Sequence, residues 1–351
     1  MAPAATLKNR LLTALAVIGL LALTACQSSA PAAAPTSPPA PAAKPTTAAA
    51  PAPTTAPAPT TAAASSSGKP LKVGVLLSTT GPFVFEGTGG IEAIKLYLEQ
   101  EKNQLGGRPV QMIYEDTEGR PDQALTKAKK LVEQDQVELL IGPVGSNEGL
   151  AIRDYVDAQK IPTFFGYAIA KDLTQDKASP YVFRTGGSLQ LSAGGGWMAA
   201  KKLGFKRAIV VSADYAAGHD AADMFKKYFE AAGGKVVNEI FPPLGATDVA
   251  PYITRVQSEL ASVDVVVLPQ IVGETAIQFV KNYDQFGLKA DKPLFVSGVS
   301  VDDASTLQPA GDAAIGVQSY AEWAAALELP ANKAFVGEFK TKYNKDPGQH
   351  H

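Results

Sequence analysis

Cysteine and histidine are almost missing from this chain. Cys26 is the only cysteine among 351 residues, and His219, His350 and His351 are the only histidines. Everything after residue 26 therefore has no disulfide, no thiolate metal site and no thiol nucleophile. His219 stands at the start of a predicted helix, where a surface or capping role is the more common one. We expect no enzyme, no metal and no cofactor.

Several motifs and charge patterns are missing too. The chain has no P-loop and no dinucleotide fingerprint, and Gly145–Gly149 lacks the spacing of a nucleophile elbow. Three basic residues, Lys8, Arg10 and Lys44, precede residue 69. Residues 69–351 therefore contain 29 of the 32 basic residues and all 34 acidic residues, which gives this part a net charge of −5. No basic stripe is present, so nucleic acid is not an expected partner. Beyond the N-terminal region no apolar run is long enough to span a bilayer.

The N-terminal 26 residues have the pattern of a secretion signal. Lys8 and Arg10 precede the apolar run Leu11–Leu23, which is too short to span a bilayer comfortably. The run Leu23-Thr24-Ala25-Cys26 resembles a bacterial lipobox, in which the cysteine is lipidated and becomes the new N-terminus. The alternative is a plain secretion signal in which Cys26 is incidental. We expect residues 1–26 to be a lipoprotein signal peptide with Cys26 as the lipid attachment site, so that the protein is anchored to the membrane outside the cytoplasm.

Residues 27–68 have a composition that does not support folding. The segment consists of Ala, Pro, Thr, Ser and a few other residues, with one charge, Lys44, and no aromatic side chain. Such a segment buries too little apolar surface to offset its ordering entropy. We therefore expect a disordered linker that holds the following 283 residues away from the membrane.

Residues 69–351 are expected to form two α/β lobes, because strand-length apolar runs alternate with helical patterns in two successive blocks. In the first block the expected strands are 71–77, 110–114, 137–141 and 161–165. The expected helices are 121–134, 147–159 and one that follows the Gly-rich stretch 87–90 and ends near Glu101. In the second block the expected strands are 208–211, 235–241, 263–268 and 294–296, and the expected helices 221–232, 249–259 and 273–286. Alternation of this kind predicts parallel sheets with helices on both faces, Rossmann-like in each lobe. The joins are expected near 181–187 and 316–323, which gives a first lobe of 69–185 with 324–351 and a second lobe of 186–323.

The loops that follow the strands are the expected place for a ligand. Ligands of open α/β sheets bind beyond the carboxyl ends of the strands, near helix N-termini that favour an anionic group. Two such lobes that face each other form a cleft that can close on a small molecule. The strand-end loops supply these candidates: Phe83, Phe85, Ser146, Asn147, Tyr167, Ala168, Ala170, Tyr215, Gln270 and Ser297. Taken alone, a serine at position 146 is more often a helix cap, and each of the aromatic residues is more often a packing residue; it is their convergence at strand ends that favours a site.

The order and spacing of several short motifs resemble the type I periplasmic binding proteins of branched-chain amino-acid ABC transporters. The resemblance covers 71 to about 347. It rests on Ser78–Phe83, Asp116, Ile141-Gly142-Pro143, Asp214-Tyr215, Asp248–Tyr252, Gly311–Val317 and Phe335–Pro347. It implies a solute-binding lipoprotein that delivers its ligand to an ABC permease in the membrane and performs no chemistry. We expect this protein to be a monomer.

The resemblance also implies roles for residues at matching positions. Ser146 is expected to bind the ligand carboxylate, with the backbone of Ala168 and Ala170 beside it. Tyr215 is expected to cover the ligand from the opposite lobe. Phe83 and Phe85 are expected to line the apolar side of the pocket.

Two departures from the family pattern bear on the ligand and on the end of the chain. Amino-acid binders of this family carry an acidic residue in the loop after the strand at Leu294, but here that loop is Ser297–Val301 and Asp302 comes slightly late. A buried ammonium without a carboxylate is costly, so an aromatic or aliphatic acid, or an amide, suits the site as well as an amino acid. Family members also continue for several tens of residues after the helix at Tyr343, so we expect a first lobe that is incomplete at its C-terminal end.

Two alternatives to a transporter component remain at this point. The same fold serves as a sensor domain whose closure signals to a partner protein. An exported α/β enzyme is the weaker alternative, because histidine is scarce and a pair of Asp or Glu side chains in the cleft would be needed for it.

Overall fold

The computed structural model describes residues 68–351 except 176, 188 and 301–303. The expected signal peptide, the lipid attachment site at Cys26 and almost all of the expected linker lie outside the described residues, as does Asp302. Within the described part, none of the helices combines the length and the apolar character needed to cross a bilayer.

The first sheet has six strands in the order β2-β3-β1-β4-β5-β6. The strands are β1 (Leu71–Leu76), β2 (Gln104–Leu105), β3 (Arg108–Glu115), β4 (Leu139–Ile141), β5 (Thr163–Phe165) and β6 (Val182–Arg184). All described pairs are parallel except that of β2 with β3. The chain runs from β1 to β3 on one side and then returns to β4 on the other side of β1. The order therefore reverses at β1, and parallel strands buried on both faces account for its unbroken apolar run.

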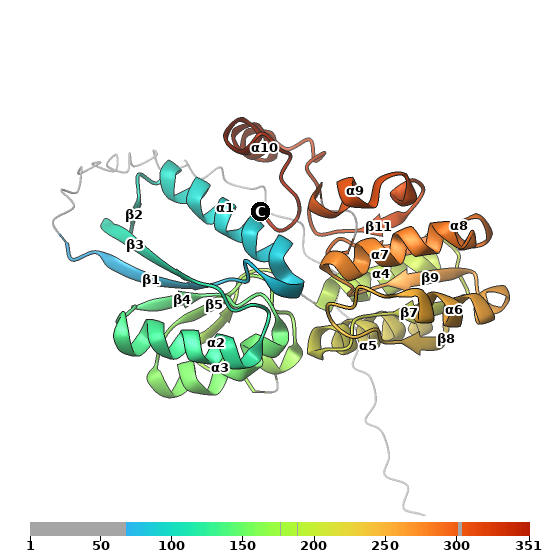
Figure 1. The fold of residues 1–351 in the computed structure, drawn as a ribbon, viewed down its shortest axis with the longest axis horizontal. Coiled ribbons are helices and arrows are strands. Elements are labelled where there is room, and N and C mark those ends of the chain that lie inside the picture. Colours follow the sequence, from blue (N-terminus) through green and yellow to red (C-terminus); the bar gives the residue numbers. More distant parts are fainter. Residues whose placement is uncertain (1–67, 176, 188, 301–303) are drawn as a thin grey trace, which may run out of the picture. The chain divides into compact units, whose positions relative to one another are not determined.

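Helices cover both faces of the first sheet (Figure 1). They are α1 (Val84–Gln100) on one face, and α2 (Pro121–Lys129) and α3 (Ser146–Gln159) on the other. A one-turn π-helix, Lys130–Gln134, extends α2. Val73 and Val75 of β1 pack toward Ile91 and Ile94 of α1. On the opposite face Leu76, Leu140 and Phe165 share a core with apolar residues of α2 and α3.

The second sheet has five parallel strands in the order β11-β10-β9-β7-β8. The strands are β7 (Arg207–Val211), β8 (Lys235–Ile240), β9 (Val265–Leu268), β10 (Leu294–Ser297) and β11 (Gln318–Tyr320). The chain passes from β7 to β8 and then returns to β9 on the other side of β7. The strand order therefore reverses at β7, as it does at β1 in the first sheet.

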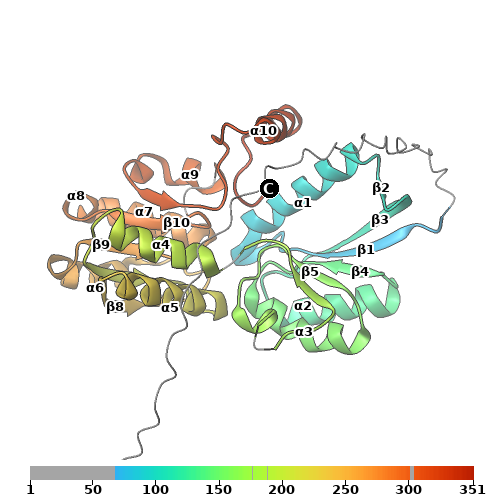
Figure 2. The ribbon, with the colours of Figure 1, turned by 180° about the vertical axis from the view of Figure 1, so that it is seen from behind.

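Helices also cover both faces of the second sheet. The helices are α4 (Leu189–Lys201), α5 (Ala216–Ala231), α6 (Ala250–Glu259), α7 (Gly273–Gln285), α8 (Leu288–Asp291) and α9 (Ala304–Ala310). Residues of α6 and α7 share one core with β7, β9 and β10. Residues of α4 and α5 share a separate core on the opposite face, and Figure 2 shows these two helices in front.

The final helix, α10 (Pro330–Tyr343), contacts the first sheet's helix α1. The hydroxyl of Tyr343 donates a 2.8 Å hydrogen bond to the carbonyl oxygen of Glu92, and Lys345 forms an ion pair with the Glu92 carboxylate at 2.7 Å. Residues at and just after the C-terminal end of α10 therefore contact α1.

The structure corrects the start of two helices. The helix expected after Gly90 and the helix expected at 221–232 begin earlier, at Val84 and Ala216. Glycines at these starts resemble helix breakers in the sequence, but here they permit close packing. A Cβ at Gly87 would lie 1.8 Å from the Ser78 carbonyl oxygen, and one at Gly218 would lie 1.8 Å from that of Ala213.

The sequence pattern did not predict α4. Its interior contains Gly194, Gly195 and Gly196, and glycine weakens an isolated helix by about 1 kcal/mol relative to alanine. A Cβ at Gly196 would lie 2.4 Å from the carbonyl oxygen of Phe225 in α5. Close contact between the two helices thus outweighs the poor intrinsic propensity of the segment.

Candidate ligand-binding site

The loops that follow β1 and β7 meet each other. Ligand sites of open α/β sheets lie where the strand order reverses, and both sheets reverse at these two strands. Phe83 ends the short helix Gly81–Phe83 after β1, and Tyr215 precedes α5 after β7. Their rings pack with centroids 5.9 Å apart at an angle of 53°. The reversal points of the two sheets are thus joined by one aromatic contact.

Hydrogen bonds to Asp116 hold the loop after β1. The Oδ1 atom of Asp116 accepts the backbone N–H groups of Thr79 and Glu118, and Oδ2 accepts the Thr80 hydroxyl at 2.8 Å. Burial alone would raise the pKa of Asp116, but these hydrogen bonds lower it below its usual value. The carboxylate is therefore ionised at neutral pH, and it fixes the segment that carries Phe83.

The loop after β7 is held by Ser212 and Gln270. The Ser212 hydroxyl lies within hydrogen-bond distance of the carbonyl oxygens of Gly218 and Gln270, at 2.8 and 3.1 Å. The Gln270 side-chain N–H donates to the Tyr215 hydroxyl at 2.9 Å. Burial and the nearby negative charge of Glu86 raise the pKa of Tyr215, although the bond from Gln270 lowers it. Tyr215 is therefore a neutral phenol at physiological pH.

Ser146 ties the loop after β5 to the start of α3. It is the first residue of α3, while Gly145 is the N-cap and donates its N–H to the Glu148 carboxylate at 2.8 Å. The Ser146 hydroxyl oxygen accepts the backbone N–H groups of Ile169 at 2.9 Å and Ala170 at 3.1 Å. Two donors occupy its lone pairs, so the hydroxyl hydrogen is the group that Ser146 offers to a ligand.

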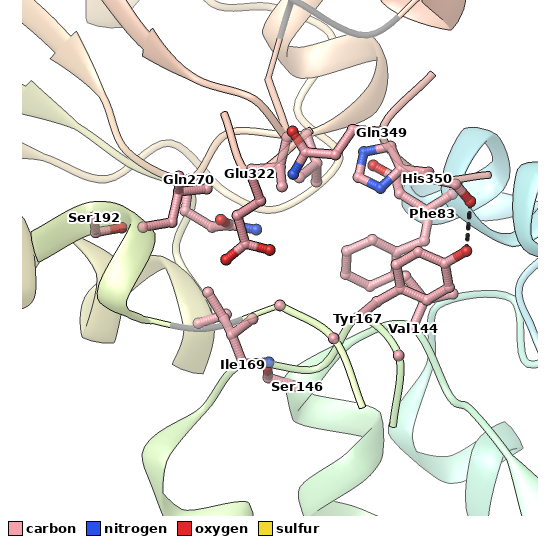
Figure 3. A pocket seen from close by; sticks show the side chains of 18 of the residues that line it. Phe83, Val144, Ser146, Tyr167, Ile169, Ser192, Gln270, Glu322, Gln349 and His350 are labelled. Atoms are coloured by element: carbon pink, nitrogen blue, oxygen red, sulfur yellow. Dashed lines mark hydrogen bonds between the residues drawn. The ribbon is translucent and has the colours of Figure 1, made fainter. Parts of the chain in front are cut away.

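These loops line a cavity of about 190 Å³ (Figure 3). The volume is below the roughly 300–1,000 Å³ of sites for drug-sized molecules, so it suits a smaller ligand. Its lining residues are Phe83, Glu86, Val144, Ser146, Gly166, Tyr167, Ile169, Gly186, Gly187, Leu191, Ser192, Tyr215, Ala217, Gln270, Val272, Val299, Glu322, Trp323, Gln349 and His350. The Tyr167 hydroxyl donates to the His350 carbonyl oxygen at 2.6 Å on one side of the cavity. Side chains from both sheets therefore surround a single small space.

Five of the ten residues singled out from the sequence line this cavity: Phe83, Ser146, Tyr167, Tyr215 and Gln270. They come from loops after five different strands, so parallel strand direction brings them to one place.

The other five do not line the cavity: Phe85, Asn147, Ala168, Ala170 and Ser297. Ala168 and Ala170 are buried in the core of the first lobe, and the N–H of Ala170 is already donated to Ser146. Ser297 is fully buried at the end of β10, and Val299 lines the cavity in its place. Phe85 is half-buried, and its ring lies near Gly273 at the start of α7.

Two carboxylates of the cavity were not identified from the sequence. Glu86 lies in the first turn of α1, three residues after Phe83, and Glu322 follows β11. Glu86 could have been identified as a lining residue from its place three residues after Phe83, because residues three apart in a helix share one face. No local sequence pattern identifies Glu322 or Trp323 as lining residues. They line the cavity only because of the course that the chain takes after β11.

The cavity holds two carboxylates, Glu86 and Glu322, together with His350, while His219 lies outside it. His219 pairs with Asp214 at 2.8 Å and packs against Phe241, and none of these three lines the cavity. Across the described residues, no three or more His, Cys, Asp or Glu side chains are grouped to hold a metal ion. The arrangement is suited to binding a small polar molecule.

Comparison with known proteins agrees with this geometry. Residues 70–351 match the family model described as periplasmic binding protein. A Leu/Ile/Val-binding protein homologue of Brucella melitensis is 30% identical over 270 residues, which cover 76% of this chain and 68% of that protein.

Two solved structures are similar over most of the described chain. An ABC transporter substrate-binding protein from Sphaerobacter thermophilus is 38% identical with a TM-score of 0.73, over 80% of this chain and 77% of that one. A solute-binding protein of an ABC transporter from Rhodopseudomonas palustris, in complex with 3,4-dihydroxybenzoic acid, is 31% identical with a TM-score of 0.74. The match covers 80% of this chain and 76% of that one.

Proposed function

The chain belongs to the periplasmic binding protein family, and we propose that it binds a small carboxylate, such as a branched-chain amino acid or an aromatic acid, in the cavity described above. It is a substrate-binding protein of the ABC-transporter type, a class that binds solutes outside the cytoplasm and performs no catalysis. The ligand is then delivered to a permease in the membrane.

One observation carries this proposal: the reversal points of both sheets face one cavity, joined by the contact between Phe83 and Tyr215. A ligand held there touches both lobes, 69–185 with 324–351 and 186–323. Its binding energy therefore favours the arrangement in which the lobes are together. A shift from almost fully open to almost fully closed needs about 5.5 kcal/mol of differential affinity.

The carboxylate preference is supported by Ser146 and the start of α3. The Ser146 hydroxyl hydrogen is available because its oxygen already accepts two backbone N–H groups. The N-terminus of a 14-residue helix adds a partial positive charge at the same place. A carboxylate oxygen is the complementary ligand group.

The test is isothermal titration of the full chain with branched-chain amino acids and hydroxylated benzoates. Phe83→Ala and Gln270→Ala should each weaken binding at least about tenfold, which corresponds to about 1.4 kcal/mol. Phe286→Ala is the matched control, because Phe286 is an exposed aromatic residue at the end of α7 outside the cavity. Unchanged affinity in both cavity variants would show that the ligand binds outside this cavity.

We also propose that Cys26 carries a lipid that anchors the protein to the membrane, with 27–68 as a linker and with the protein as a monomer. The support is the sequence Leu23-Thr24-Ala25-Cys26 after an apolar run. Cys26→Ser should release the protein from the membrane fraction, whereas Ser28→Ala should not. Retention of the Cys26 variant in the membrane fraction would contradict the lipid anchor. Light scattering of the released protein measures its molar mass and so tests whether it is a monomer.

A further inference from the structure

The carboxylate of Glu148 lies directly behind the place where Ser146 faces the cavity. Glu148 is in the first turn of α3, two residues after Ser146, and it is fully buried. Its Oε2 atom accepts the backbone N–H of Gly145 at 2.8 Å, and Gly145 immediately precedes Ser146. Glu148 does not line the cavity itself, so it acts on a ligand only through its charge and through the residues that it holds.

Glu148 also meets the loops that follow two other strands. The hydroxyl of Thr117, after β3, acts on the Glu148 carboxylate as a hydrogen-bond donor, and Thr117 Oγ1 lies 2.9 Å from Oγ of Ser78, after β1. A Cβ on Gly145 would lie 2.5 Å from Glu148 Oε2 and 2.5 Å from an edge carbon of the Phe83 ring, so these two side chains are close neighbours. Glu148 is thus the point at which three strand-end loops come together.

Near neutral pH Glu148 changes its charge. Burial raises its pKa to about 7, and the negative charge of Asp116 acts in the same direction, although the hydrogen bonds from Thr117 and Gly145 lower it. Asp116 is the charged group that acts on Glu148, and it stays ionised near neutrality because its own pKa is lowered. A rise in pH through neutrality therefore adds one negative charge beneath the Phe83 and Ser146 loops.

The added charge opposes the charge of a carboxylate ligand. The N-terminus of α3 carries a partial positive charge, and an ionised side chain in its first turn neutralises part of it. A ligand carboxylate on the Ser146 hydroxyl would be a second negative charge nearby. Like charges repel each other more strongly in a protein interior than in water. A protonated Glu148 removes this repulsion.

We propose that Glu148 is a positioning residue for the carboxylate site and that its ionisation weakens the binding of the ligand. The protein then holds a carboxylate more tightly in an acidic medium than in a neutral or alkaline one. By linkage, Glu148 takes up a proton as the ligand binds. This inference rests on the proposed function, because it needs a ligand carboxylate at Ser146, and it adds a control of that same site by pH.

The first test is isothermal titration of the full chain with leucine and with benzoate at several pH values. The affinity for either carboxylate should fall about tenfold as the pH rises from about 5.5 to about 8.5, which corresponds to a rise of about one unit in the pKa of Glu148 when the ligand binds. Benzamide has the shape of benzoate without its charge, so its affinity should not fall in this way.

The matched variants are Glu148→Gln and Glu133→Gln. The first keeps an acceptor for the Gly145 N–H but has no charge, so it should bind at every pH about as tightly as the unchanged protein binds at acidic pH. The second should keep the full pH dependence, because Glu133 is exposed, accepts the Tyr155 hydroxyl and lies outside the cavity.

Three titratable side chains of the lining also bear on the result: Glu86, Glu322 and His350. Protonation of any of them would favour an anion as well. A pH dependence that persists in Glu148→Gln would therefore belong to the lining and would overturn the proposal.

The second test needs no variant, so it does not depend on how Glu148→Gln folds. The heat of leucine or benzoate binding is measured at about pH 7.5 in phosphate and in Tris, two buffers whose ionisation enthalpies differ. The difference between the two heats should correspond to an uptake of about half a proton per bound ligand.

The outcomes separate this inference from the proposed function. A carboxylate that binds with a flat pH profile and without proton uptake would overturn the inference and leave the carboxylate-binding function intact. An equal fall for benzamide and benzoate would mean that Glu148 acts through the fold of the loops and not through the charge of the ligand. If neither leucine nor benzoate binds at any pH, the proposed function fails and this inference fails with it.

Discussion

The backbone N–H of Lys171 donates a 3.0 Å hydrogen bond to Oδ2 of Asp220. Lys171 begins the short helix Lys171–Leu173 after β5 of the first sheet, and Asp220 belongs to α5 beside the second sheet. The Lys171 ammonium lies 3.6 Å from the same carboxylate. Asp220 therefore joins the loop next to Ser146 to the helix that follows Tyr215.

Asp220→Ala should make separation of the two lobes easier. Loss of this partly exposed contact is expected to remove about 1 kcal/mol from the closed arrangement, which lowers ligand affinity about fivefold. Titration measures the affinity, and small-angle scattering without ligand should show a larger radius of gyration. Asp223→Ala on the exposed side of α5 is the control. An unchanged affinity would mean that Asp220 is not a closing contact.

Ser146→Ala should affect both stability and binding. The variant leaves the buried N–H groups of Ile169 and Ala170 without their acceptor. We expect the free energy of unfolding to fall by about 2 kcal/mol and the carboxylate affinity to fall as well. Urea titration measures the first effect. Ser179→Ala removes two hydrogen bonds at the exposed surface of the same lobe and should cost less than Ser146→Ala, because water can replace them.

Glu148 should make the protein less stable as the pH rises toward neutrality. Burial raises its pKa to about 7, although hydrogen bonds from Thr117 and Gly145 lower it, whereas an unfolded glutamate titrates near pH 4.3. Between these values the folded state holds the proton more tightly, so stability falls as the pH rises from about 4 to about 7. The loss is at most about 4 kcal/mol.

Urea unfolding of the protein and of Glu148→Gln at several pH values between about 5 and about 8 checks this trend. The variant should show a much flatter profile in that range. Parallel profiles would exclude Glu148 as the source. Asp116, with its lowered pKa, contributes the opposite trend at lower pH, where its protonation removes stability.

Gly87→Ala should disrupt the start of α1. The new Cβ would lie 1.8 Å from the Ser78 carbonyl oxygen, so the loop that carries Phe83 and Glu86 has to move. We expect a loss of more than about 2 kcal/mol in unfolding free energy together with weaker ligand binding. Gly337→Ala in α10 is the matched control, because nothing lies within 4 Å of its Cβ. That change should be neutral or stabilising by up to about 1 kcal/mol.

The alternation of elements followed from local patterns in the sequence. Apolar runs such as Leu71–Leu76 and Val265–Leu268 are long enough only for buried strands, and both are strands in the structure. The helix α4 was not predicted, because its glycines disfavour an isolated helix. They are compatible with a helix here because they allow the close contact with Phe225 of α5. Local patterns do not contain that partner.

For the cavity, strand direction was enough to predict which loops gather within each lobe, because parallel strands place all their carboxyl ends at one edge of the sheet. Phe83, Ser146 and Tyr215 follow from that rule. Which side chain of each loop faces the cavity could not be predicted in this way, as with Glu86 rather than Phe85. Glu322 also lines the cavity, although it belongs to no loop that follows a predicted strand. The direction of a side chain depends on the helix turn that it occupies and on the segment that packs against it, and both depend on contacts between residues far apart in the sequence.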